Sequence, residues 1–161
     1  MPEFSVEERI KEAVTKVASG DAAIMAVMAK AINDKYGEEG LNAIREAIIQ
    51  HITPLFAHVG KQAGARVGNG DATDWVKIEH AISGVPVETL DITPTRARIR
   101  TTRCPRAKQL RKVWPDFCRK VWIAVEQAAA HAANQKLVVR PYEKNLASGD
   151  DCCQILCEFE E

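Results

Sequence analysis

The chain has 161 residues, enough to bury a hydrophobic core without disulfides or metal ions. Its 22 Lys and Arg balance 22 Asp and Glu, so its charge gives no bias toward nucleic acid or anionic membranes. The acidic, amphipathic start is unlike a signal peptide, and no apolar stretch is long enough to span a bilayer. We therefore expect a cytoplasmic protein with no nucleic-acid or membrane partner.

Helical spacing of apolar residues predicts a helical first half. Ser5 opens an S-x-x-E capping box, and Gly20 is a plausible end of that first helix. Gly37 stands where a second helix would end, and Pro54 fits the first turn of a fourth helix. Asp71 can cap a further short helix. The sequence thus predicts four helices followed by a short fifth one.

After Gly84 the periodicity changes from helix to strand. The expected strands are Val87–Ile92, Arg96–Cys104, Lys136–Tyr142 and Cys152–Glu160. A long helix, Pro105–Asn134, should separate the second strand from the third, with a kink at Pro115. We predict a single α+β domain over residues 1–161, with a helical part (5–83) and a part with a small antiparallel sheet and a kinked helix (87–160).

The last strand carries two cysteines on one face, Cys153 and Cys157, at the spacing of alternate strand residues. They can be small core residues, because free cysteine is often buried. Cys153 follows a Gly-Asp turn at the start of the strand, a position that also suits a nucleophile if a cation or base lowers its pKa. A third use is a zinc site that combines Cys153 with Cys104 and other distant residues such as Cys118 and His131.

Many basic residues lie in the second predicted strand and at the start of the helix that follows it. Such a run is commonly a solvated face. It can also be an anion clamp, in which Arg98 or Arg100 grips a substrate carboxylate through a bidentate fork. The run lacks interleaved aromatic residues for base stacking, which disfavours nucleic acid as its partner.

Two stretches together carry a family resemblance. The first is the run Lys35-Tyr36-Gly37-Glu38-Glu39-Gly40, and the second is the series Asn134, Leu146, Gly149-Asp150, Cys153 and Phe159. In this order they resemble the L-2-amino-thiazoline-4-carboxylic acid hydrolase family. Where the family carries a Cys and an Asp on the helix before the Asn, this chain has Ile123 and Glu126, and Gln135 replaces a Pro after the Asn.

The resemblance implies a hydrolase that opens a small cyclic amidine or amide bearing a carboxylate. It implies Cys153 as the nucleophile or a metal ligand, Asp150 as a base or orienting group, and Asn134 as a donor to the developing charge. Glu126 would replace the missing acid, and Arg98 or Arg100 would hold the carboxylate. Asp150 and Asn134 also suit purely structural roles, in a turn and at a helix end.

Two other functions stay open. The C-terminal pattern G-D-x-x-C-x-x-x-C-x-F resembles vinyl-reductase-type ligand-sensing domains, which predicts a non-catalytic small-molecule or zinc-binding module. A partner-binding domain is the third possibility. The Ala-rich stretch Val125–Ala133 would then form an exposed apolar patch, which could also be a homo-oligomer contact.

Overall fold

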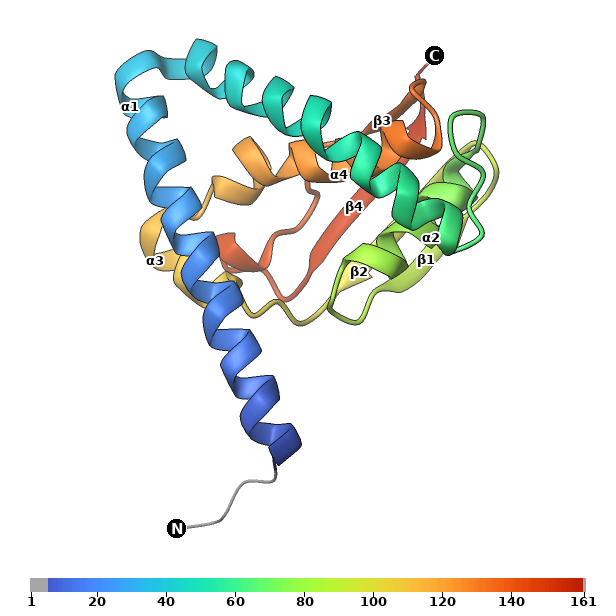
Figure 1. The fold of residues 1–161 in the computed structure, drawn as a ribbon. Coiled ribbons are helices and arrows are strands. Elements are labelled where there is room, and N and C mark those ends of the chain that lie inside the picture. The colour runs from blue at the N-terminus through green and yellow to red at the C-terminus, as the bar shows by residue number, and fades with distance from the viewer. Residues whose placement is uncertain (1–5, 161) are drawn as a thin grey trace.

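Helices pack on one face of a four-stranded antiparallel sheet in this computed structural model, which describes residues 6–160 and, from residue 20 onward, their side chains (Figure 1). The elements are α1 (Val6–Gln62), α2 (Ala72–Ile82), β1 (Glu88–Ile92), β2 (Arg96–Thr101), α3 (Ala107–Val113), the π-helical turn η1 (Cys118–Trp122), α4 (Ile123–Ala133), β3 (Leu137–Val139), the 3-10 turn η2 (Leu146–Ser148) and β4 (Cys153–Phe159). The predicted α+β class is therefore confirmed.

The first helix, α1, is one bent element where the sequence predicted four helices. The bend lies at Gly37, whose φ of 61° and ψ of −145° interrupt the helix, as Figure 1 shows. The predicted breaks at Gly20 and Pro54 are wrong, because the helix continues through both. Proline's fixed φ is compatible with a helix, and Phe56 just beyond it packs against the core and holds the chain in place. The capping box predicted at Ser5 lies outside the described residues.

The sheet has the order β1-β2-β4-β3, with β4 paired on both sides. The predicted alternation is confirmed, since Ala97 and Ile99 of β2 are buried, as are Cys153, Ile155 and Cys157 of β4. This inner face meets α4 and α2, and the second half of α1 lies on α4 (Figure 1). The helices and the inner face of the sheet therefore enclose the core.

The helix predicted over Pro105–Asn134 is divided where a kink was expected. It consists of α3, η1 and α4, and the chain leaves helical geometry at Trp114, immediately before Pro115. The Ala-rich α4 is buried among the other helices and the sheet. Val125–Ala133 therefore does not form the exposed apolar patch that would support a partner-binding role, because small side chains let α4 pack closely inside the core.

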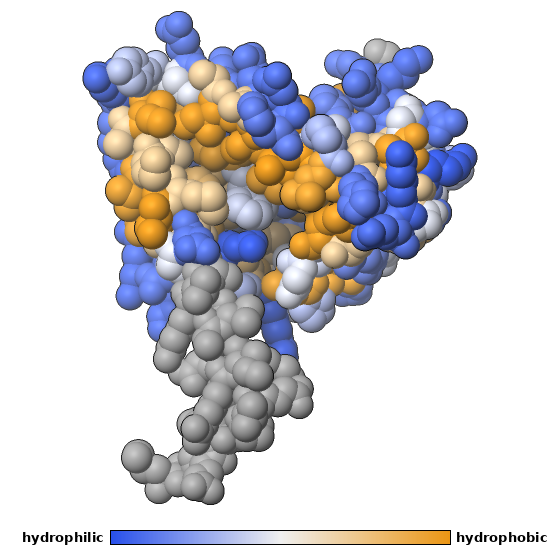
Figure 2. Space-filling model, viewed as in Figure 1, coloured by the Kyte–Doolittle hydropathy of each residue, from blue (hydrophilic) through white to orange (hydrophobic). Residues whose placement is uncertain are grey.

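Exposed apolar side chains lie on α1 instead. Ile24, Val27 and Met28 are each more than half exposed, and Figure 2 shows hydrophobic surface over this helix. No helix among residues 6–160 combines the length and apolarity needed to cross a membrane.

Candidate functional site

A cavity of about 240 Å³ lies between the inner face of the sheet and the helices. Ile99 and Ile155 form its floor on β2 and β4, and Ile82 and Val125 line it from α2 and α4. An engineered cavity of about 150 Å³ in another protein admits benzene. This one is large enough for a single ring with a few substituents.

The polar groups of the cavity centre on two buried carboxyl groups, Glu79 of α2 and Glu126 of α4, which hydrogen-bond to each other. Trp75 Nε1 donates to Glu79 Oε1 at 3.1 Å. Glu126 Oε1 accepts from Trp122 Nε1 at 3.1 Å and from the Tyr142 hydroxyl at 2.9 Å. Aromatic donors therefore hold each carboxyl in place. These donors bond to the Oε1 atom of each carboxyl.

Burial and the adjacent Glu126 charge raise the pKa of Glu79 well above its usual value, and burial also raises the pKa of Glu126. Glu126 receives two outside hydrogen bonds that favour its ionised form, whereas Glu79 receives one. The hydrogen bond between the two carboxyls also raises the pKa of Glu79 and lowers that of Glu126, so Glu79 holds the shared proton more tightly.

Three thiols also line the cavity: Cys104, Cys118 and Cys153. Burial raises the pKa of Cys153 to about 11, and burial raises the pKa of Cys118 to about 12. Both thiols are thus neutral at physiological pH. A nucleophile needs the opposite shift, so the site does not activate Cys153 in the way that a catalytic cysteine requires.

We expect the buried thiols to be chemically inert in the folded protein. With a pKa near 11, Cys153 should react with iodoacetamide at pH 8 more than about 100-fold more slowly than a free cysteine, because so little of it is thiolate. Peptide mapping by mass spectrometry measures each rate, and the urea-unfolded chain is the control. Alkylation of folded Cys153 at the free-thiol rate would contradict the assignment.

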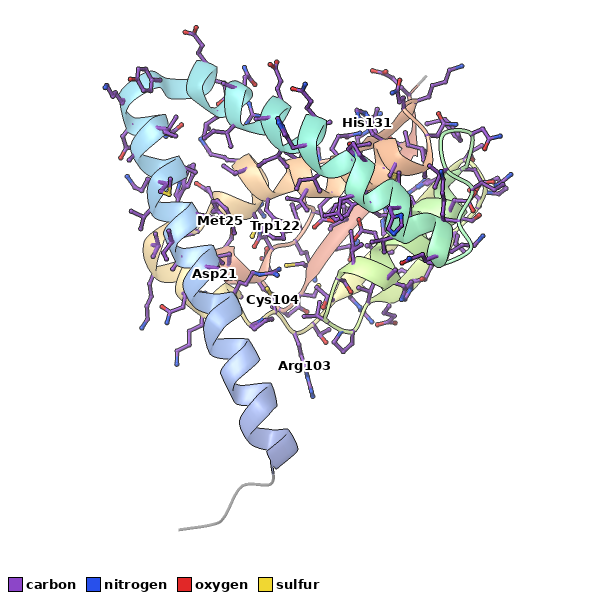
Figure 3. All side chains as sticks on the ribbon, in the orientation of Figure 1. Asp21, Met25, Arg103, Cys104, Trp122 and His131 are labelled. Atoms are coloured by element: carbon purple, nitrogen blue, oxygen red, sulfur yellow. The ribbon has the colours of Figure 1, made fainter. Side chains whose placement is uncertain are left out.

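The structure brings four of the predicted site residues to this cavity: Cys153, Glu126, Cys104 and Arg100. Figure 3 shows Cys104 on the segment after β2, on the same side of the molecule as Trp122 of η1. Arg100 also donates to Glu88 Oε2 at 2.7 Å, so its charge is already paired.

The other predicted site residues lie outside the cavity lining. Asn134 ends α4 and donates to the Gly70 carbonyl at 2.9 Å. Asp150 accepts from the Asn145 backbone N–H at 2.6 Å, which fixes the turn before β4. Arg98 pairs with Glu143 at 3.0 Å. Asn134 and Asp150 therefore do not line the cavity with Cys153, and each bonds to a backbone group instead.

Neither an imidazole base nor a zinc site forms around Cys153 in the described part of the chain. His131, considered as a partner for this thiol, lies in the last turn of α4, away from Trp122 at its start (Figure 3). Within residues 6–160, no group of three or more His, Cys, Asp or Glu is close enough to hold a metal ion. The donors present, Cys104 and Cys153 included, thus do not fit the zinc site that the sequence left open.

Sequence reasoning missed Glu79, Trp75 and Tyr142, which complete the acid pair. Glu79 and Trp75 stand four residues apart on α2, so they share one helix face. That spacing of a Trp and a Glu recurs in Trp122 and Glu126. The repeated W-x-x-x-E pattern was the available signal, and it predicts a hydrogen-bonded carboxyl on each helix.

Comparisons with known proteins identify a fold and no family. No protein-family model matches the chain, and no curated protein matches it. Among solved structures, it is similar to the phenol-responsive sensory domain of the transcription activator PoxR with phenol. The TM-score is 0.60 at 16% identity, over 86% of this chain and 74% of that one. A trafficking protein particle complex subunit 3 from Naegleria fowleri, covalently bound to palmitic acid, gives a TM-score of 0.45 at 12% identity, over 88% and 96%. The chain therefore shares its fold with a sensory domain.

Proposed function

We propose that this chain is a non-catalytic binding module for a small, uncharged and mostly apolar molecule, which occupies the cavity between the sheet and the helices. The observation that carries the proposal is the cavity itself, whose lining is mostly apolar and whose polar groups include the fixed acid pair, three thiols, Arg100 and Arg106. A few oriented polar groups in an apolar cavity are typical of ligand sites.

The fold similarity supports this proposal. A phenol-responsive sensory domain has the same overall fold, and phenol is a ligand of the size that this cavity admits. The similarity also favours the sensing role over the hydrolytic one, although the two chains share only 16% of their residues.

Ring-opening hydrolysis is the competing proposal, because Cys153 and Glu126 both line the cavity. It requires an activated nucleophile, and the raised pKa of Cys153 opposes that. Arg100, expected to hold a substrate carboxylate, is paired with Glu88. The binding proposal needs neither an ionised thiol nor a free arginine.

Titration calorimetry with phenol, cyclohexanol and a cyclic amidine carboxylate separates the two proposals. We expect phenol or cyclohexanol to bind one to one with a Kd of about 1 mM or tighter, and to be recovered unchanged. Turnover of the amidine that is lost in Cys153→Ala would establish the hydrolase instead. If neither binding nor turnover is seen, the binding proposal is wrong.

A further inference from the structure

The acid pair is the feature of the cavity with the most specific chemistry. Glu79 and Glu126 come from two different helices, α2 and α4, and both are almost completely buried. Core packing alone does not require two facing carboxyl groups, since burying even one is expensive unless it is paired. A polar group that lines an apolar cavity is available to a ligand placed there.

The aromatic hydrogen bonds use only one oxygen of each carboxyl group. All three aromatic donors go to the Oε1 atoms, two to Glu126 and one to Glu79. Apart from the bond between the two carboxyls, no donor from the described part of the chain reaches an Oε2 atom. A ligand hydroxyl can donate to one of these oxygens, and a carboxyl has spare lone pairs for it.

The charged and titratable groups around the acid pair determine the electrostatic potential inside the cavity. From the segment before α3, Arg106 lies with its guanidinium 4.6 Å from the Trp122 ring centre and favours the ionised form of Glu126. From η1 and β4, the thiols of Cys118, Cys153 and Cys157 face the pair, and Tyr142 faces it from the segment after β3. From β2, Arg100 is paired with Glu88, and Cys104 lies in the segment that follows.

We propose that the Glu79–Glu126 pair anchors the hydroxyl of a neutral ligand and couples its binding to the proton that the two carboxyls share. The inference rests on the proposed binding function and specifies its ligand class. A ligand carboxylate would bring a negative charge beside two buried acids whose pKa values burial already raises. A neutral hydroxyl adds no charge and can donate to the open carboxyl oxygen.

Desolvation gives the coupling its direction. An apolar ligand that fills the cavity displaces water from the acid pair, and loss of water favours the protonated state. The ligand hydroxyl acts in the opposite direction, because a donor favours the ionised carboxyl, but burial already outweighs the hydrogen bonds at both carboxyls and we expect it to outweigh one more. By linkage, the protonated pair binds the ligand more tightly, so affinity falls as pH rises and the pair loses its proton. A cationic ligand would show the reverse, because it replaces the proton and binds more tightly at higher pH.

Three ligands of similar size test the proposal: benzyl alcohol, benzylamine and benzoate, titrated from pH 5.5 to pH 9. Benzyl alcohol should bind best, and its affinity should fall by up to about tenfold per pH unit once the pair titrates. In Glu79→Gln the dependence of affinity on pH should be weaker, because only one of the two acids remains to titrate. The same series on Cys104→Ala, which removes a thiol from the cavity lining and keeps the acid pair, should show the wild-type slope.

The outcomes separate this inference from the proposed function. If benzyl alcohol binds with an affinity independent of pH, or if benzoate or benzylamine binds more tightly, the acid-pair inference is wrong and the binding function stands. If none of the three binds at any pH, the proposed function itself fails. The change of benzyl alcohol affinity with pH in the wild-type chain tests the acid-pair inference even if Glu79→Gln does not fold.

Discussion

The substitution Val125→Trp is expected to abolish ligand binding while the protein stays folded. Val125 lines the cavity from α4 and is only half-buried, so a larger side chain can extend into the empty space without displacing the core. We expect binding of phenol or benzyl alcohol to weaken by about 100-fold, because the indole occupies the ligand's volume. Calorimetry measures the affinity, and thermal unfolding confirms the fold.

A matched control is available on the outer surface. Val27 of α1 is 55% exposed and lies away from the cavity lining, so Val27→Trp makes the same chemical change where no ligand is expected. This variant should bind like the wild type. Equal binding by Val125→Trp and the wild type, or loss of binding in Val27→Trp, would place the ligand on the exposed apolar residues of α1 and contradict the cavity assignment.

The substitution Asp74→Asn is expected to lower the free energy of unfolding by about 2 kcal/mol at pH 7. Asp74 is fully buried and accepts from the Arg66 backbone N–H at 3.1 Å, from Lys77 at 2.9 Å and from the Asp71 backbone N–H at 3.1 Å. Burial alone would raise its pKa, but these donors and Arg66 outweigh it and lower the pKa of Asp74 to about 2. Asparagine keeps the shape and loses the charge that orders these donors.

The pH dependence of this stability difference follows from the lowered pKa of Asp74 in the folded chain. Because the pKa of Asp74 is lower in the folded chain, its contribution is complete above pH 5 and is lost as pH falls from 4 toward 2. The difference between wild type and Asp74→Asn should therefore shrink over that range in urea unfolding. Lys77→Met, which removes a half-exposed partner, should change stability by less than about 1 kcal/mol. A difference that stays constant down to pH 2 would show that the charge of Asp74 does not stabilise the fold.

Asp74 also helps to explain why the glycine-rich connection between α1 and α2 is attached to the rest of the fold. Three glycines, Gly64, Gly68 and Gly70, interrupt the helical pattern there, and such a pattern is typical of a flexible connection. In the structure, the Gly68 and Gly70 N–H groups donate to the Ala132 and Ala133 carbonyls at 3.1 and 2.9 Å. These bonds and the Asp74 cluster attach the segment to the end of α4, and a pattern of single residues does not reveal such long-range contacts.

The sheet was predictable because the alternation of buried and exposed residues in a strand is visible among neighbours in the sequence. Two-residue alternation placed Ile99 and Ile155 on the buried face, and that face became the floor of the cavity. The helix boundaries were less predictable. Gly20 and Pro54 carry real local penalties, but the helix continues through both, and Ala22 and Phe56 just beyond them pack in the core. Only Gly37, which adopts a positive φ, turned out to interrupt the helix.

The candidate site was predictable only in part, for a similar reason. Cys153 and Glu126 could be singled out by their place in a pattern, and both line the cavity. Glu79 could not be paired with Glu126 from sequence, because α2 and α4 are brought together only by the fold. Asn134 and Asp150 matched the same family pattern, yet each is used by nearby backbone groups.

The most direct test of the account is an experimental structure of the protein crystallised with 4-bromobenzyl alcohol. The bromine gives an anomalous signal that locates the ligand independently of any binding assay. We expect one peak inside the cavity, near Ile99 and Ile155, with the hydroxyl directed toward Glu79 and Glu126. A peak confined to the exposed residues of α1, or an unoccupied cavity at saturating ligand, would contradict the claim that this chain binds a small neutral molecule between its sheet and its helices.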